Sequence, residues 1–330
     1  MTEIIIVLLL ALLIFLIYST IKVRFSSFVD PGKPAFANDS ETEPEVKHLY
    51  NHVHYLTEQI GSRSVYEYEK INAAKNYLET VLKDLGFDYT LQNYQYQGNT
   101  FSNIIVTIPG QKAPEKIFII GAHYDTVFNT PGADDNASAV AVLLELCRLL
   151  MGYQPAKTLK LIFFVLEEPP AFQSKYMGSY VYAKTAKAKK EDIFGMISLE
   201  MLGYYHDTKG AQTFPLPLMG FFYSNVPNFI GVVGNLKSRR LVKQVADSIK
   251  KGSSILVEYL AAVRLVPGID LSDHAPFWRM GYPAVMITDT AFYRNPNYHT
   301  VTDTIDTLDF KKMAELLKGI VQVVKDQTST

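Results

Sequence analysis

The chain has 330 residues, of which 48% are hydrophobic, so it can bury a full core and belongs to the globular class. Its formal net charge of -1 at pH 7 lacks the basic excess that sequence-independent nucleic-acid binding requires, and we exclude nucleic acid as a partner. The single cysteine, Cys147, cannot form a disulfide within the chain and stands in an apolar run where a buried thiol is expected.

The N-terminal region contains an uncharged apolar stretch, residues 4–21, which as a helix covers roughly 27 Å of a bilayer core of about 30 Å. No Lys or Arg precedes it and no small-residue cleavage site follows it, so a retained membrane anchor is favoured over a cleaved signal peptide. Lys22 and Arg24 favour a cytoplasmic domain, but long domains disregard so small a bias and the side stays open. We expect an anchor or signal segment (1–24), a Pro-, Ser- and acid-rich linker (25–44) and a folded domain (45–330).

The folded domain shows the alternation of an α/β protein. Helical periodicity predicts helices over 45–60, 65–85, 137–151, 176–189 and 309–325, and short apolar runs predict strands over 102–108, 116–124, 159–168, 194–202 and 283–290. Strands that are apolar on both faces and separated by helices indicate a mixed, mostly parallel sheet covered by helices on both sides. The irregular segment 204–235 is expected to be an insertion near the site instead of a second domain.

Residue types that bind metals stand at the ends of four predicted strands. They are His123 and Asp125, Glu167 and Glu168, Glu200, and His299 in the loop after the last strand. A solvated acid at a strand end explains any one of them, but the carboxyl ends of strands in an open α/β sheet converge on one edge. Mixed histidine and carboxylate ligands suit Zn²⁺, and also Co²⁺ or Mn²⁺, so the sequence predicts a catalytic type of metal site.

The adjacent pair Glu167 and Glu168 supports this interpretation. Two neighbouring carboxylates are difficult to desolvate together without a cation to balance them. One of the two can bind metal while the other accepts the proton of a metal-activated water, as a hydrolytic site needs. Asp125, two residues beyond His123, is placed to orient that imidazole, with an ordinary surface acid as the alternative.

Six blocks carry a resemblance to a known family: GAHYDTV, PGADDNASAVAVLLEL, LIFFVLEEPPAF, SLEMLGYY, SDHAPFWRMGYPAVMITDT and NPNYHTVTDTIDTLDF. Together they resemble the zinc-dependent M28 peptidases, aminopeptidases whose family also contains carboxypeptidases and glutaminyl cyclases. The resemblance runs from about Gly61 to the C terminus, with the blocks in family order. It implies a zinc-exopeptidase (phosphorylase/hydrolase-like) fold, a peptide substrate, and a domain on the extracytoplasmic side of the membrane.

The resemblance also implies a role for individual residues, carried over onto His123, Asp135, Glu167, Glu168, Glu200 and His299. His123 and Glu200 would hold one zinc, Glu168 and His299 the other, and Asp135 would bridge the two, while Glu167 would be the general base. Many aminopeptidases of the family have Asp at the position of Glu200, which is longer but can still ligate. Three ligating carboxylates and a bridging hydroxide would neutralise two Zn²⁺ ions per chain.

Other polar and aromatic residues have weaker expectations. Asp134 has no assigned role, and His274 is expected to be an internal histidine in a helix that Asp273 caps. Aromatic residues that flank the expected ligands, and that could line a specificity pocket or belong to the core, are Tyr204, Tyr205, Phe292, Tyr293 and Tyr298.

Three functions are compatible with the sequence. The first is a zinc exopeptidase, an aminopeptidase acting through a two-metal bridging hydroxide. The second is a glutaminyl-cyclase-like transferase on the same scaffold with one working metal. The third is a membrane-anchored interaction domain without catalysis, against which the complete set of charged ligands argues, because a retired site loses charged residues that are left unpaired.

Overall fold

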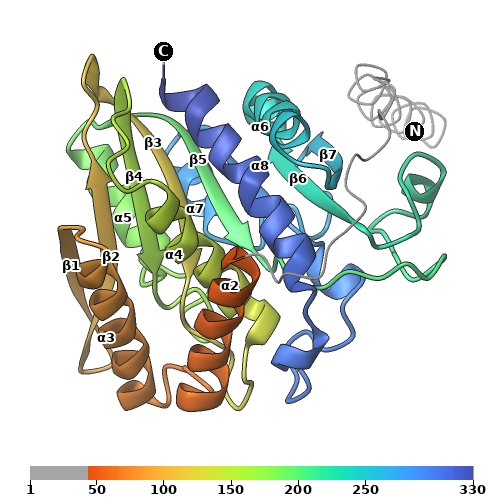
Figure 1. Ribbon diagram of the computed structural model, residues 1–330, viewed down its shortest axis with the longest axis horizontal. Coiled ribbons are helices and arrows are strands. Elements are labelled where there is room, and N and C mark those ends of the chain that lie inside the picture. The colour runs from red at the N-terminus through yellow and green to blue at the C-terminus, as the bar shows by residue number, and fades with distance from the viewer. Residues whose placement is uncertain (1–43, 330) are drawn as a thin grey trace, which may run out of the picture.

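The computed structural model describes residues 44–329, and their centre is an eight-stranded sheet with the order β1-β2-β4-β3-β5-β8-β6-β7 (Figure 1). The strands are β1 (Tyr89–Tyr96), β2 (Asn99–Ile108), β3 (Ala113–His123), β4 (Lys157–Phe164), β5 (Asp192–Glu200), β6 (Phe229–Asn235), β7 (Leu256–Ala262) and β8 (Ala284–Thr288). Neighbours β3/β4, β3/β5, β5/β8 and β6/β7 are parallel, whereas β1/β2, β2/β4 and β6/β8 are antiparallel. The expected mixed, mostly parallel sheet is therefore confirmed.

Helices cover both faces of this sheet. The side chains of Phe118 and Ile120 in β3 belong to a core shared with α2 (Pro44–His54), α3 (Tyr68–Asp84), α4 (Ala139–Leu149), α6 (Arg239–Gly252) and α8 (Phe310–Thr328). Ile117 and Ile119 of the same strand face a second core, with α5 (Gly178–Ala188) and α7 (His274–Arg279). This alternation follows from the two-residue period of a strand, and explains why the central strands are apolar without interruption.

All five predicted helices are confirmed, with the first ending in a π-helical turn, Tyr55–Ile60. The sequence prediction missed β1, β6, β7 and α6. Segment 204–235 is irregular only as far as residue 228, because Phe229–Asn235 is β6. Two glycines interrupt β6, Glu258 interrupts the apolar residues of β7, and β1 is a polar edge strand, so none of the three shows an unbroken apolar run.

The predicted membrane segment, and the linker apart from Pro44, lie outside the described residues. Among residues 44–329, the helices are too short or too polar to cross a bilayer. The anchor and the side of the membrane stay predictions of the sequence.

Arg63 connects the first helical region to the loop between β3 and α4. Its guanidinium is fully buried and donates five hydrogen bonds to carbonyl oxygens at 2.8–3.0 Å. The acceptors are Leu56, Gly61, Tyr124, Pro131 and Gly132. Burial lowers the pKa of Arg63 to about 10, which still leaves the side chain charged at neutral pH. Loop 124–132 is thereby fixed at both ends by one side chain.

We predict that Arg63→Lys destabilises the protein by on the order of 2–4 kcal/mol, because one ammonium group cannot supply five N–H donors in a fork and leaves buried carbonyls unpaired. Urea denaturation followed by Trp278 fluorescence measures the change. Arg279→Lys is the matched control, since Arg279 is exposed and donates one hydrogen bond to Gln173. Equal stability of the two variants would contradict the structural role of Arg63.

Candidate functional site

The predicted ligand types meet at one edge of the sheet, at the carboxyl ends of the adjacent strands β4, β3, β5 and β8. His123 is the last residue of β3 and Glu200 the last of β5. Glu167 and Glu168 follow β4, His299 lies in the loop beyond β8, and Asp135 lies in the turn Ala133–Ser138 before α4. The convergence expected from the strand pattern is confirmed, since the site side chains group within 4.8 Å of one another in overlapping sets of three.

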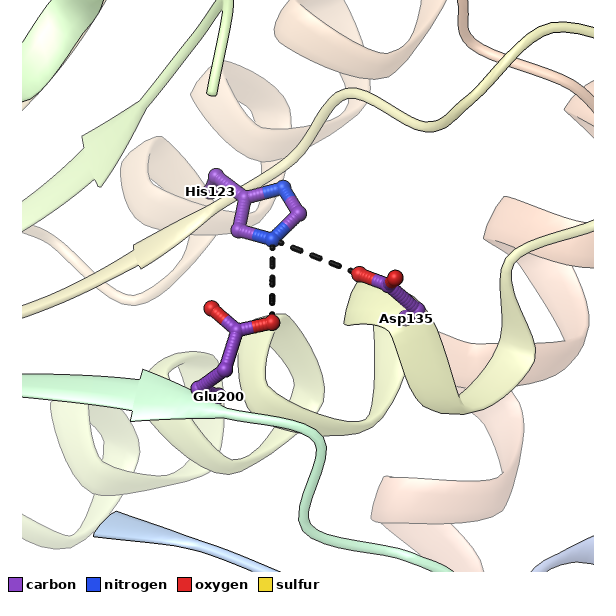
Figure 2. A group of neighbouring side chains, drawn as sticks. All are labelled: His123, Asp135 and Glu200. Carbon is purple, nitrogen blue, oxygen red and sulfur yellow. Dashed lines mark hydrogen bonds and ion pairs between the residues drawn. The ribbon is translucent and has the colours of Figure 1, made fainter. Parts of the chain in front are cut away.

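Asp135 lies between the two histidines. Its Oδ1 is 3.4 Å from Nε2 of His123, and its Oδ2 is 3.1 Å from Nε2 of His299. Figure 2 shows His123 with the same Nε2 also facing Glu200, whose Oε1 is 3.5 Å away. On the other side, Oε1 of Glu168 is 3.4 Å from Nε2 of His299. The side chains thus form two groups of ligand type that share Asp135.

Glu167 stands beside the first group and is buried. Its Oε2 lies 4.0 Å from Nε2 of His123, farther than the oxygens of Asp135 and Glu200. Burial raises the pKa of Glu167 well above its usual value, and the carboxylates of Glu168 and Glu200 add to the shift while His123 opposes it. Glu167 is therefore a carboxyl group with a high proton affinity at the edge of the cluster.

Several acids share one buried space in this cluster, and each disfavours the ionisation of the others. Burial and the carboxylate of Asp135 raise the pKa of Glu168 to about 8. Burial also opposes ionisation of Asp135, but the two histidines outweigh it and lower the pKa of Asp135. Burial opposes the charged form of His299 as well, and its contacts with Asp135 and Glu168 raise its pKa to about 10. Such a cluster attracts cations strongly, because positive charge is what allows its acids to ionise together.

The backbone next to three site residues is held in the left-handed region. Leu166 has φ 61°, Met201 has φ 50° and His299 has φ 58°. This region costs a residue with a side chain about 1–3 kcal/mol and is uncommon outside functional segments. Tyr298 stacks on the imidazole of His299 with ring centroids 3.7 Å apart. The turns that aim Glu167, Glu200 and His299 are therefore specified by surrounding contacts.

Asp125 supports the site chiefly through the backbone. Its two carboxylate oxygens accept hydrogen bonds from the N–H groups of Glu167 and Glu168, both at 3.1 Å. Its Oδ1 also lies 3.6 Å from Nδ1 of His123, while the backbone carbonyl of Asp125 is closer to that nitrogen, at 3.1 Å. The expected contact with the imidazole exists, and the carboxylate in addition fixes the turn that carries the glutamate pair.

Two supporting residues escaped the sequence prediction. Ser272 donates a hydrogen bond of 2.6 Å to Oε2 of Glu200, and Asp303 accepts hydrogen bonds from the backbone N–H groups of Asp134 and Asp135. Ser272 stands in a block that carries the family resemblance, but a serine beside His274 does not by itself indicate a contact with Glu200. Asp303 follows His299 by four residues and stands in another of those blocks, but nothing local points to its partners, which lie more than 160 positions away.

Two expectations concerned the helix that begins at His274: that His274 is an internal histidine, and that Asp273 caps the helix. His274 is buried, faces the carbonyl of Ile269 at 2.7 Å, and burial lowers its pKa to about 4, as suits an internal neutral histidine. The predicted cap by Asp273 is wrong, since its carboxylate accepts no hydrogen bond from the helix. Burial raises the pKa of Asp273 to about 7. The charge of nearby His123 opposes this rise, and that of Glu200 adds to it.

An apolar cavity of about 120 Å³ adjoins Glu200. Phe229 and Gly231 of β6 and Met286 and Thr288 of β8 form part of its wall. Of the five aromatic residues that flank the ligands in sequence, the cavity includes Phe292, Tyr293 and Tyr298 but neither Tyr204 nor Tyr205. The aromatic pocket expected from the sequence exists in part.

Comparison with known proteins agrees with this geometry. Residues 103–324 match the family model described as Peptidase family M28. The chain belongs to peptidase family M28. An uncharacterised protein of Escherichia coli K12, YfbL, is 37% identical to this M28 chain, over 89% of the chain and 90% of YfbL. Leucine aminopeptidase 1 of Sclerotinia sclerotiorum is 28% identical, over 92% of this chain and 77% of that protein.

Solved structures share the fold of this M28 chain. BSAP, a zinc aminopeptidase from Bacillus subtilis, aligns with a TM-score of 0.68 at 15% identity, covering 88% of this chain and 97% of BSAP. A glutaminyl cyclase from Bacteroides thetaiotaomicron aligns with a TM-score of 0.62 at 21% identity, covering 84% and 97%. The family and its aminopeptidase members support a zinc-dependent peptide hydrolase, and the mixed α/β sheet is the one found in aminopeptidase structures.

For this M28 peptidase we predict that Asp125→Asn lowers kcat/KM by about 10- to 100-fold, because an amide oxygen can accept only one of the two N–H groups that hold the glutamate pair. Steady-state kinetics measure the loss. Asp84→Asn, at an exposed position near the end of α3, is the matched control. Unchanged kinetics of Asp125→Asn would rule out a supporting role.

Proposed function

We propose that the protein is a zinc-dependent aminopeptidase with two metal ions in the site. The observation that carries the proposal is the position of Asp135, whose two oxygens face different histidines, each with a further carboxylate beside it. The aminopeptidase relatives support the reaction class, and the site geometry supports the choice of residues. The two-metal arrangement and the individual roles are part of the proposal.

The residues fit a pair of zinc ions. His123 and Glu200 would hold one ion, Glu168 and His299 the other, with Asp135 shared. Oδ1 of Asp135 is buried and makes no hydrogen bond within residues 44–329, which suits an oxygen that serves as a metal ligand. Nitrogen and carboxylate donors without thiols are the ligand set of catalytic zinc, and three carboxylates offset most of the four positive charges.

When bound, zinc supplies a Lewis acid for the scissile carbonyl and makes water acidic near neutral pH. Glu167 then accepts the proton of the attacking water and delivers it to the leaving amine. Its high proton affinity and its distance of 4.0 Å from Nε2 of His123 suit this work better than ligation. Asp125 keeps the Glu167 backbone in place while the proton moves.

The cavity next to Glu200 would receive the side chain of the first residue of the peptide. It lies on the β8 and β6 side of the site, and its volume of about 120 Å³ suits a large aliphatic or aromatic group. For scale, an apolar cavity of roughly 150 Å³ holds benzene in another protein. Burial of an apolar side chain there would add binding energy while leaving the scissile bond beside the cluster.

We predict that the protein hydrolyses aminoacyl anilides with a free amino group and cleaves their N-acetylated forms more slowly by a factor on the order of 100 or more. A chelator abolishes the activity and added zinc restores it. Release of the aniline chromophore is the measurement. Equal cleavage of blocked and free substrates would exclude an aminopeptidase.

Glu167→Gln is the control that separates chemistry from metal binding. It should retain the zinc content of the wild type while turnover falls by about 100- to 10,000-fold, because an amide cannot accept the proton. Metal analysis also tests the alternative function. One zinc per chain, together with cyclisation of an N-terminal glutamine in place of anilide hydrolysis, would favour the glutaminyl-cyclase alternative, whose fold the chain shares.

Gly231 offers a test of the cavity. A Cβ at this position would lie 3.2 Å from the carbonyl oxygen of Thr288 and 3.6 Å from Cγ2 of Thr290. We predict that Gly231→Val reduces the ratio of kcat/KM for a phenylalanine anilide to that for an alanine anilide by about 10-fold or more, because the added methyl groups occupy the space of the substrate side chain. Val233→Ala, which widens the same wall, should shift the ratio in the opposite direction. Unchanged ratios in both variants would place the first residue elsewhere.

A further inference from the structure

Asp134, next to the shared aspartate, pairs with Asp289, the first residue after β8. Both side chains are fully buried, and hydrogen bonds tie their carboxyl groups to the same two turns. Buried carboxyl oxygens cost free energy unless each accepts a hydrogen bond. The donors to Asp134 and Asp289 therefore indicate which parts of the chain the two residues hold together.

The donors come from two turns that are distant in sequence. Oδ1 of Asp134 accepts from the N–H of Gly203 at 2.8 Å, and Oδ2 of Asp289 accepts from the N–H of Tyr204 at 3.0 Å. Oδ1 of Asp289 accepts from the N–H of Ala291 at 2.8 Å, and Oδ2 of Asp134 accepts from Nδ2 of Asn295 at 2.7 Å. All four oxygens of the pair therefore have a donor.

Each connected segment also carries a proposed zinc ligand. Asp134 precedes Asp135 directly, Gly203 and Tyr204 follow Glu200, and the segment from Ala291 to Asn295 leads to His299. In addition, the N–H of Asp289 donates to the carbonyl of Met201 at 2.8 Å. Met201 is the residue with φ 50° immediately after Glu200, so the pair sits where the backbone needs external support.

We propose that Asp134 and Asp289 are positioning residues that set the relative placement of Asp135, Glu200 and His299. The inference rests on the proposed function, because it takes these three side chains to be zinc ligands. Neither aspartate has a free oxygen with which to bind metal, so both act through the turns that they join. A ligand set assembled from three distant segments keeps its geometry only if those segments are fixed to one another.

The decisive variants are Asp289→Ala and Asp289→Asn. The alanine removes the acceptors of Tyr204 and Ala291 and leaves Asp134 without its partner. The asparagine is nearly isosteric, but its single oxygen can accept from only one of these two N–H groups. Asn295→Ala, which removes a single donor to Asp134, is a milder variant for the case that Asp289→Ala does not fold. All are made in the full chain.

The matched control is Glu145→Ala. Glu145 is a buried carboxylate in α4 that bonds Arg148 and His48, away from the site residues. It tests whether losing a buried acid is enough to disturb the site. Three quantities are measured for each variant: zinc affinity by competition with a chromophoric chelator, the visible absorption spectrum of the cobalt-substituted protein, and the melting temperature of the metal-free protein.

We expect Asp289→Ala to weaken zinc binding by about 10-fold or more and to alter the cobalt spectrum. Asn295→Ala and Asp289→Asn should each show a smaller change in the same direction, because each variant loses one hydrogen bond of the pair and keeps the others. Glu145→Ala should lower the melting temperature and leave zinc affinity and the cobalt spectrum unchanged.

Wild-type zinc affinity and cobalt spectrum in Asp289→Ala, or in Asn295→Ala if the first variant does not fold, would overturn the positioning role while leaving the proposed function intact. An equal loss of zinc affinity in Glu145→Ala would overturn it as well, because the effect would then be general destabilisation. A wild-type chain that binds no zinc would overturn the proposed function together with this inference.

Discussion

The structure depends on the repulsion among carboxylates in one buried space. Asp135, Glu167, Glu168 and Glu200 approach the same two histidines within 4.0 Å. In a site that excludes water, the cost of such crowding is several kcal/mol for each uncompensated charge. Burial first, and the neighbouring carboxylates second, raise the pKa of Glu167 and of Glu168. Divalent cations relieve the cost of this crowding, and the same strain makes one remaining carboxyl group a strong proton acceptor.

The fold makes this crowding possible because the strands that carry the ligand types are neighbours. β4, β3, β5 and β8 are consecutive and parallel, so their carboxyl ends form one edge. The helices on both faces pack on these strands through two apolar cores, and the polar site residues lie at the edge of the sheet. The packed sheet supplies the stability of the fold, and the site residues lie at its edge. The left-handed backbone at Leu166, Met201 and His299 is tolerated because these residues adjoin the packed strands.

The sequence predicts the residues of metal-binding type, but not the residues that hold them in place. A histidine or glutamate at the end of an apolar run can be placed from the sequence, because the carboxyl ends of parallel strands lie at one edge of the sheet. Arg63, Ser272 and Asp303 act through contacts with groups far away in the chain, and no local pattern encodes such a contact. Three strands were missed for a related reason: β1, β6 and β7 are stabilised by pairing with neighbours, not by a continuous apolar run.

The segment 123–135 contains three aspartates, and their hydrogen bonds separate those that support the backbone from the one that could bind a metal. Asp125 and Asp134 have both oxygens occupied by N–H donors of the protein, so neither has an acceptor to offer a metal. Asp135 has the opposite character, because its own backbone N–H is held by Asp303 while its Oδ1 is buried without a hydrogen bond. A buried oxygen that the fold leaves unsatisfied costs free energy unless something else fills its place. That cost, together with its position between His123 and His299, distinguishes Asp135 from Asp125 and Asp134.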